Sequence, residues 1–376
     1  MIYFDHAAAA PILPEVQKAY PAFLQELSGN EEAGHAQGYR LRQKRELFAS
    51  ELVRTLLPGV DKYDPQAVFF ASDATTLLES VGRIMQKKAV SAWHSPLDHI
   101  ANSKMLERYF SELKPFKLDS CGVITDLPTA ANAPQLIMLT AVQSEIGVFQ
   151  DLGKLITTLR QTAPEAIILL DAVQMARFYP YPANLPKPDL MLVSGAKLGA
   201  GSGAALLANG KHSAFFKKSF DALRSGEHII GKGDLLQIAA LTLAAKCCKA
   251  KSLEAQEKLH ELNSFLRKNL SDMILPNGKK LILTVNQAHG ADHILHMILP
   301  GYQSGVLVRI FSDHDIMLSS GSACAAETPD PSAILQALNY SREDAYSGLR
   351  LSLSPENTLE EAEIFIKTLK TVLQNY

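Results

Sequence analysis

Short apolar runs alternate with amphipathic segments between residues 67 and 209. In chain order the runs are AVFFAS, AVSAWH, QLIMLTAV, AIILLDAV, DLMLVSGA and GAALLAN, and polar or turn-forming residues separate them. Continuous apolar runs of this length are typical of strands that are buried on both faces of a sheet. Several of the intervening segments, such as DATTLLESVGRIMQ and DLGKLITTLRQ, carry helix-start signals. The alternation predicts an α/β fold with a mostly parallel sheet.

The pattern changes after about residue 234. Residues 234–269 are rich in Ala, Leu, Lys and Glu, which predicts long helices and a boundary between two lobes. The segments KLILTVN and DHILHMILP then predict strands of a second, α+β lobe. The final segment TLEEAEIFIKTLKTVLQNY predicts an amphipathic helix that closes this lobe.

Charge and composition narrow the kind of ligand. The chain has 376 residues, 47% of them hydrophobic, and 37 basic residues nearly balance 39 acidic ones for a formal charge of −2. No overall basic field therefore indicates a nucleic-acid or membrane partner, and we expect a small-molecule ligand. No apolar stretch reaches the roughly 20 residues that span a bilayer, and the start MIYFDHAAAAP lacks signal-peptide features. These features predict a cytoplasmic protein.

The cysteines predict neither disulfides nor a metal site. Cys121, Cys247, Cys248 and Cys324 are few for this length and lack the paired spacing of metal-binding cysteines. We expect free thiols. Cys247 and Cys248 lie in an Ala-rich helical pattern, where buried cysteine commonly fills space.

Polar residues follow several of the predicted strands. Ligands of an open parallel sheet bind beyond the carboxyl ends of its strands, so these residues are candidates for a site. Small residues follow the lysine in SGAKLGAGSGAA and leave room beside it. The candidates at the strand ends are Ser72, Ala74, Thr75, Ser144, Glu145, Asp171, Gln174, Ser194 and Lys197.

An aspartate and a lysine at two such strand ends suit pyridoxal 5′-phosphate (PLP). Lys197 would hold the cofactor aldehyde as a Schiff base, and Asp171 would keep the pyridine nitrogen protonated so that the ring accepts electrons. The backbone amides that open a helix at Ala74 and Thr75 would bind the phosphate. A simpler interpretation is equally open on spacing alone, because an aspartate after a strand is commonly a helix cap and a lone lysine is commonly solvated.

Eight motifs are spread along nearly the whole chain. In order they are YFDHAAAAP, FFASDATT, SPLDHIAN, AVQSEIGVFQDL, LLDAVQ, LVSGAK, SSGSAC and LRLSLS. Their order and spacing resemble those of the cysteine desulfurases within the class V aminotransferase superfamily, and SSGSAC is similar to the segment of the group with the longer catalytic loop. The resemblance implies fold type I of PLP enzymes. It implies a large domain over residues 15–250 with a mostly parallel, seven-stranded sheet, and a smaller α+β domain of residues 1–14 and 251–376 that carries the cysteine loop.

The resemblance also implies a role for each matching position. Lys197 would form the Schiff base, Asp171 would pair with the pyridinium nitrogen, and Gln174 would bond the ring hydroxyl. His99 would stack on the ring and transfer protons. The remaining implied roles are phosphate binding by Ala74, Thr75 and Ser194, contact with ring and substrate by Ser144, capture of the substrate carboxylate by Arg350, and acceptance of sulfur as a persulfide by Cys324.

Four features depart from the family pattern, and one of them is that residues 199–203 lack the usual Gly-Pro turn after the lysine. Ala196 stands where a histidine usually precedes the lysine, and Ser144 stands where an asparagine usually reaches the ring. Asp234 falls where a threonine of the partner subunit usually binds the phosphate, although Lys232 lies close enough in sequence to offset its charge. Each lost hydrogen bond is worth roughly 0.5–3 kcal/mol, so these departures predict weaker cofactor binding.

The resemblance implies a homodimeric L-cysteine desulfurase that leaves sulfur on Cys324 and releases alanine. The sequence does not identify the acceptor, protein or otherwise, that then receives the sulfur. A selenocysteine lyase or an aminotransferase on the same framework is an alternative, because fold resemblance does not determine the substrate. A third interpretation is a catalytically weakened paralogue that binds a partner. The departures favour it, whereas the joint presence of Lys197, Asp171, His99, Cys324 and Arg350 disfavours it.

Overall fold

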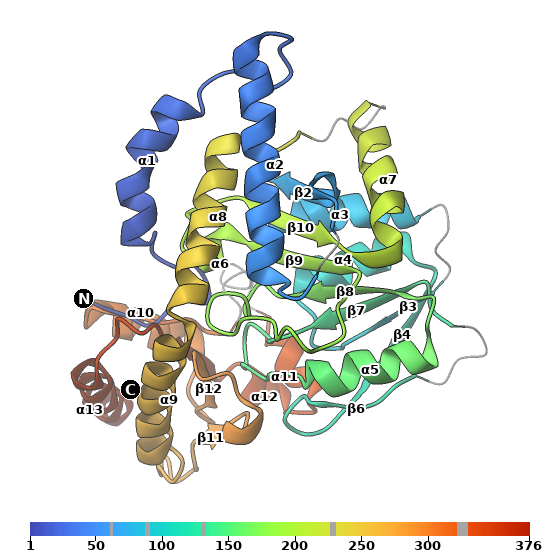
Figure 1. Cartoon of the computed structure of the whole chain (residues 1–376). Helices are drawn as coiled ribbons and strands as arrows, with labels where there is room; N and C mark the ends of the chain where they lie inside the picture. Colours follow the sequence, from blue (N-terminus) through green and yellow to red (C-terminus); the bar gives the residue numbers. More distant parts are fainter. Residues whose placement is uncertain (61–62, 87–90, 129–132, 226–230, 322–329) are drawn as a thin grey trace.

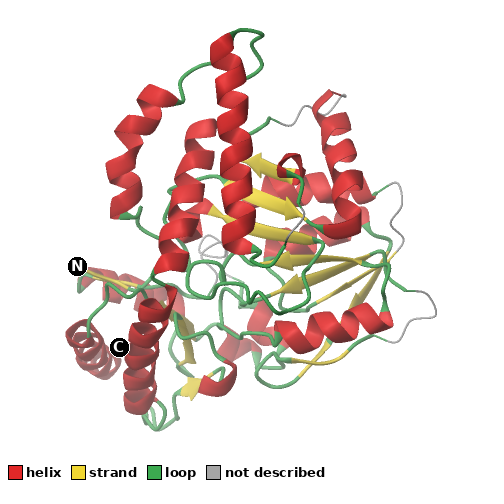
Figure 2. Cartoon of the chain, viewed as in Figure 1, coloured by secondary structure: helices red, strands yellow, loops and turns green. Residues whose placement is uncertain are grey.

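The computed structural model describes residues 1–60, 63–86, 91–128, 133–225, 231–321 and 330–376. Its centre is a seven-stranded sheet with helices on both faces (Figures 1 and 2). Strand β10 runs antiparallel to both of its neighbours, and the other neighbouring pairs are parallel. The mostly parallel sheet predicted from the apolar runs is therefore confirmed. Across the sheet the order is β2 (Val68–Ala71), β10 (Ala204–Ala208), β9 (Leu190–Ser194), β8 (Ile167–Asp171), β7 (Leu136–Thr140), β3 (Ser91–His94) and β4 (Glu112–Pro115).

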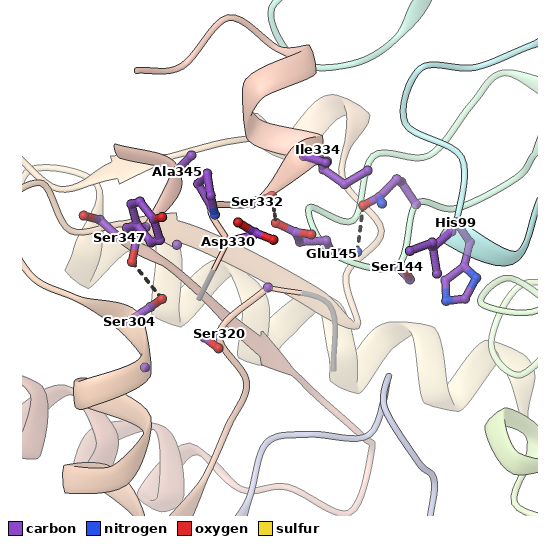
Figure 3. Close-up of a pocket in the computed structure, with 18 of the residues that line it drawn as sticks. His99, Ser144, Glu145, Ser304, Ser320, Asp330, Ser332, Ile334, Ala345 and Ser347 are labelled. Atoms are coloured by element: carbon purple, nitrogen blue, oxygen red, sulfur yellow. Dashed lines mark hydrogen bonds between the residues drawn. The ribbon is translucent and has the colours of Figure 1, made fainter. Parts of the chain in front are cut away.

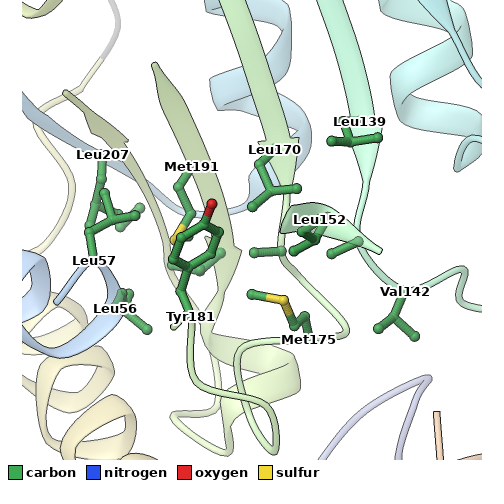
Figure 4. Close-up of a cluster of buried hydrophobic side chains, with 14 of the residues drawn as sticks. Leu56, Leu57, Leu139, Val142, Leu152, Leu170, Met175, Tyr181, Met191 and Leu207 are labelled. Carbon is green, nitrogen blue, oxygen red and sulfur yellow. The ribbon is translucent and has the colours of Figure 1, made fainter. Parts of the chain in front are cut away.

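Alternate side chains along each strand enter two separate hydrophobic layers. Ile168 and Leu170 of β8 belong to one layer, part of which Figure 4 shows, and Ile167 and Leu169 belong to the other. Both faces of the sheet exclude water, which explains why the strands are continuous apolar runs. The first layer is covered by α2 (Ala36–Leu56), α5 (Leu152–Thr162) and α8 (Leu235–Ala250). The second is covered by α3 (Ala74–Met85), α4 (Ile100–Tyr109) and α7 (Ser213–Ser225).

A three-stranded antiparallel sheet forms a further core. Its order is β11 (Ile282–Leu283), β12 (Ile294–Ile298) and β14 (Gly348–Ser352). The strand predicted in DHILHMILP is confirmed as β12, but the one predicted in KLILTVN is only two residues long. The chain turns soon after it into a short 3₁₀ helix, Gln287–His289. The surrounding helices are α9 (Ser252–Leu270), α10 (Ser304–Asp313) and α13 (Leu359–Asn375), and the domain boundaries at residues 14 and 250 stay a prediction.

The N-terminal segment connects the two cores. Strand β1 (Ile2–Tyr3) pairs in parallel with β13 (Ile316–Met317), and Asp5 forms a bridge with Ser352. The segment then crosses to the large sheet, where the Ala10 amide donates to the Ala196 carbonyl at 2.9 Å. Residues 7–10 are thereby held against the turn that carries Lys197.

None of the described helices is both long and apolar enough to cross a bilayer. The remaining elements are short or lie at the periphery. They are α1 (Pro14–Glu26), α6 (Gly195–Leu198), α11 (Ala333–Ala337), α12 (Arg342–Ala345), β5 (Lys117–Leu118), β6 (Ile124–Asp126) and the 3₁₀ helices Pro65–Ala67 and Gly210–His212.

Candidate active site

A cavity of about 240 Å³ opens at the carboxyl ends of β7, β8 and β9. The parallel register places Thr140 beside Asp171, so the ends of neighbouring strands meet at one edge of the sheet. This is the position at which open α/β sheets bind ligands. Of the ten residues to which the resemblance assigns a role, nine line the cavity: Ala74, Thr75, His99, Ser144, Asp171, Gln174, Ser194, Lys197 and Arg350. The tenth, Cys324, lies outside the described residues.

Lys197 is carried by the one-turn helix α6, directly after β9. The turn requires glycine at its start, because a Cβ on Gly195 would be 2.1 Å from the Ser202 carbonyl oxygen. It also ends on a glycine, Gly199, in the left-handed conformation. The Lys197 amine donates a hydrogen bond to the Ala8 carbonyl, so the N-terminal segment holds the amine at the cavity.

The carboxylate of Asp171 is oriented by two donors. The Asn102 side chain donates to Oδ2 at 2.8 Å, and the Val173 amide donates to Oδ1 at 3.0 Å. Asn102 is completely buried on α4, and its own Oδ1 has no partner in the structure. Gln174, three residues further along, donates to the Ala7 carbonyl at 2.9 Å. Helix α4 thus holds the Asp171 side chain in place, and the N-terminal segment holds the Gln174 side chain.

A second carboxyl group, Asp98, is buried beside Asp171. It accepts a 2.6 Å hydrogen bond from the Thr140 hydroxyl and a 3.2 Å bond from the Ser95 amide. Burial raises the pKa of Asp98 to about 7, the Thr140 bond works against that shift, and the charge of Asp171 adds to it. Asp98 is therefore partly protonated near neutral pH.

His99 caps the start of α4 at the mouth of the cavity. Its Nδ1 accepts from the Ala101 amide at 3.2 Å, so the neutral ring carries its proton on Nε2. Burial lowers the pKa of His99, Asp171 opposes this shift, and the Lys197 charge reinforces it. The imidazole is consequently neutral at pH 7 and can accept a proton.

Arg350 projects from β14 of the smaller sheet into the same cavity. Its side chain is 2% exposed, and Nη2 donates to Asp5 Oδ1 at 2.8 Å while Nη1 donates to the Ser144 carbonyl at 2.8 Å. Ser319 supports Asp5 with a hydroxyl hydrogen bond of 2.7 Å. The guanidinium is thereby fixed between the two cores, and its buried Nε has no hydrogen-bond partner among the described residues.

The opposite end of the cavity is the start of α3, where Ala74 and Thr75 lie. Asp73 caps this helix: its Oδ1 accepts from the Thr76 amide at 2.7 Å, and its Oδ2 accepts from the Ser72 hydroxyl at 2.8 Å. Partial burial alone would raise the pKa of Asp73, but hydrogen bonds from Thr76, Ser72 and Thr75 outweigh it and lower the pKa. The carboxylate of Asp73 thus lies where we expected the phosphate of PLP. At the other end of the cavity, the ring end, the Lys197 amine, the Asp171 carboxylate and the Gln174 amide fit the cofactor ring.

A larger cavity of about 1100 Å³ adjoins the first (Figure 3). His99 and Ser144 line both cavities. Glu145 lines the larger cavity, is buried, and accepts a hydrogen bond from the Ser332 hydroxyl. Gly321 and Asp330, on either side of residues 322–329, line this cavity too. The predicted cysteine loop therefore leaves and rejoins the described chain beside the candidate site.

Sequence reasoning assigned no role to Asp73, Asp98 or Asn102. Signals for all three were present: Asp73 precedes a helix start, where aspartate is a favoured cap, and Asp98 directly precedes His99. Asn102 lies one helical turn after the His99 cap and therefore on the same side of α4. The structure also pairs Lys232, which was expected to offset Asp234, with Glu32 at 2.6 Å.

The sequence and the fold match one known class of protein. The chain belongs to the class V aminotransferase family, whose model matches residues 2–365. Among curated proteins it is similar to the cysteine desulfurase IscS of Escherichia coli strain K12 / DH10B, with 26% identity over 391 residues, 98% of this chain and 92% of that protein.

Solved structures show the same fold. A NifS-like protein from Rickettsia africae has a TM-score of 0.80 at 21% identity, covering 99% of both chains. The cysteine desulfurase from Thermococcus onnurineus NA1 has a TM-score of 0.79 at 17% identity, covering 100% of this chain and 95% of that one.

Proposed function

We propose that this chain is a PLP-dependent L-cysteine desulfurase of the cytoplasm that acts as a homodimer. The observation that carries the proposal is the meeting of Lys197, Asp171, His99 and Arg350 in one cavity, although they come from separate segments of the chain. The family membership and the likeness to a cysteine desulfurase support the same reaction.

The residues at the ring end would hold the cofactor. When bound, PLP supplies an electron sink for the carbon atoms of an amino acid. Lys197 would bind the aldehyde, and Asp171, oriented by Asn102, would hold a proton on the ring nitrogen. Gln174 would donate to the ring hydroxyl, and His99 would lie against the ring. With its Nδ1 occupied by the Ala101 amide, His99 would exchange protons through Nε2.

Arg350 would orient the substrate. Its guanidinium would bind the carboxylate of cysteine with two parallel hydrogen bonds, while the carbonyl of Ser144 and the carboxylate of Asp5 keep it in place. The hydroxyl of Ser144 would face the ring and the substrate from the other side. This arrangement would point the substrate side chain toward the larger cavity that Ser144 and His99 share.

Cys324 would take the sulfur, an assignment that rests on the sequence motif. Its thiolate would attack the sulfur of the bound cysteine, forming an S–S bond while the Cβ–S bond breaks. The electron pair of that bond would stay on Cβ, which gains a proton and leaves as part of alanine. The persulfide would then pass its outer sulfur to an acceptor.

The test is to supply purified chain with PLP and L-cysteine and to measure alanine and sulfide. The Lys197→Ala variant should lose the absorbance of lysine-bound cofactor and both products. Cys324→Ser should keep that absorbance and lose both products, while Cys121→Ser serves as the matched control. Mass spectrometry should place one extra sulfur on Cys324. If Cys324→Ser releases sulfide at the wild-type rate, an elimination or transamination at the same cofactor is the better account.

The departures at the phosphate end favour one second candidate, a weakened paralogue that binds a partner. Ala196 provides no donor there, and Asp73 provides a negative charge. This candidate requires that no alanine forms from cysteine even when the cofactor absorbance is fully developed.

A further inference from the structure

The N-terminus of α3 normally offers an anion site, because its first amides have no partner within the helix and carry partial positive charge. In this chain the side chain of Asp73 occupies that anion site. The carboxylate of Asp73 accepts from the Thr76 amide and from the Thr76 hydroxyl, the latter at 3.1 Å. The helix end that faces the cavity therefore already has an anion of the chain itself bonded to it.

The other cavity-lining groups do not restore the lost attraction. Among the described residues that line the cavity, the lysine and arginine side chains are Lys197 and Arg350. Lys197 is turned toward the N-terminal segment and donates to Ala8, and Arg350 is paired with Asp5. The groups that remain near the start of α3, Thr75 and Ser194, are neutral.

Within one chain, a phosphate dianion at this end would approach Asp73 without a compensating cation among the described residues that line the cavity. Two negative charges a few ångströms apart repel each other even at an effective dielectric constant of about 20, although solvent reduces the effect because Asp73 is exposed in the single chain. The ring end carries no such conflict, since Lys197, Asp171 and Gln174 fit the aldehyde, the ring nitrogen and the ring hydroxyl.

We infer that Asp73 makes this cavity discriminate against the cofactor phosphate, so that PLP is held chiefly through its ring and Lys197. The chain then has little preference for PLP over pyridoxal, the same aldehyde without phosphate. This inference rests on the proposed function, because it requires that the cavity binds the pyridoxal ring.

The experiment titrates PLP and pyridoxal separately into the full-length wild-type chain and into Asp73→Asn. The dissociation constants come from the absorbance of the lysine-bound aldehyde. Asparagine caps helices as well as aspartate does, so the substitution removes the charge and keeps α3 intact. Asp151→Asn is the matched control, because Asp151 caps α5 through the Lys154 amide and does not line the cavity.

Asp73→Asn should tighten PLP binding at least ten-fold and leave pyridoxal binding unchanged, and Asp151→Asn should alter neither. If the wild-type chain prefers PLP by more than a thousand-fold and Asp73→Asn keeps that ratio, the inference is overturned while the proposed function stands. If neither aldehyde gives the lysine-bound absorbance in any variant, the proposed function fails and the inference fails with it.

Discussion

At the scale of single residues, the burial of Asp98 near the charge of Asp171 makes the stability of the chain depend on pH. Asp98 is buried, and it is held by Thr140 and Ser95. Because burial raises its pKa to about 7, the folded chain binds a proton at Asp98 over a range in which the unfolded chain does not. The contribution of neutral Asp98 to the free energy of unfolding is fully present below pH 4, and it is lost as the pH rises through about 7.

The Asp98→Asn variant should therefore become more stable relative to wild type as the pH rises from 4 to 7, by about a few kcal/mol in total, and level off above that. Urea unfolding at several pH values measures the difference. The buried histidines His6, His293 and His296, whose pKa values burial lowers, contribute an opposite slope in both proteins and cancel. If the unfolding free energies of the wild type and of Asp98→Asn changed in parallel with pH, Asp98 would not titrate in this range.

Arg350 provides a second test at this scale. Arg350→Lys keeps the charge but cannot span Asp5, Ser144 and a carboxylate together, so KM for cysteine should rise about 10- to 100-fold, with a smaller change in kcat. Arg267→Lys is the control, because Arg267 is also buried but bonds Val285 and Asn263 away from the cavity. Equal losses in both variants would indicate a general effect of removing a buried guanidinium.

At the scale of elements, the turn that carries Lys197 is the most constrained. Gly195→Ala places a Cβ 2.1 Å from the Ser202 carbonyl and 3.0 Å from the Gly203 carbonyl, both of them backbone atoms that cannot move aside independently. We expect a loss of about 2 kcal/mol or more in unfolding free energy and a weaker absorbance of lysine-bound cofactor.

Gly34→Ala is the matched control for that variant, since nothing lies within 4 Å of a Cβ at Gly34. Chemical denaturation and cofactor titration of both variants separate a general glycine effect from the displacement of α6. An unchanged midpoint in Gly195→Ala would mean that the turn relaxes freely.

The elements that the sequence predicted well are those with a strong apolar pattern. The buried strands β7, β8 and β9 read as continuous apolar runs, and the strand-end rule located Asp171 and Lys197. Strand β4 was missed because it lies at the sheet edge and its sequence, Glu-Leu-Lys-Pro, has no buried residue. The position of Asp98 next to His99 indicates that it lies near the site, but its raised pKa could not be predicted from the sequence, because that shift depends on burial and on a carboxylate 73 positions away in the chain.

At the scale of the whole molecule, one end of the cavity is open to solvent in a single chain. Asp73 and Thr75 line it and are nevertheless exposed. We expect a second subunit to cover this end, so that light scattering at micromolar concentration gives twice the mass of the chain. A monomer that still converts cysteine to alanine would contradict the dimer.

The path of the N-terminal segment has a consequence for how the protein is made. Asp5, Ala7 and Ala8 are made before their partners, which are Arg350, Gln174 and Lys197 respectively. All strands of the large sheet, together with Gln174 and Lys197, have been made once residue 208 has emerged, but Arg350 follows much later. Ala7 and Ala8 can therefore pair with the large sheet long before Asp5 can pair with Arg350. A ribosome-bound chain that stops before β14 would hold a sheet with its lysine in place and no arginine to receive a substrate.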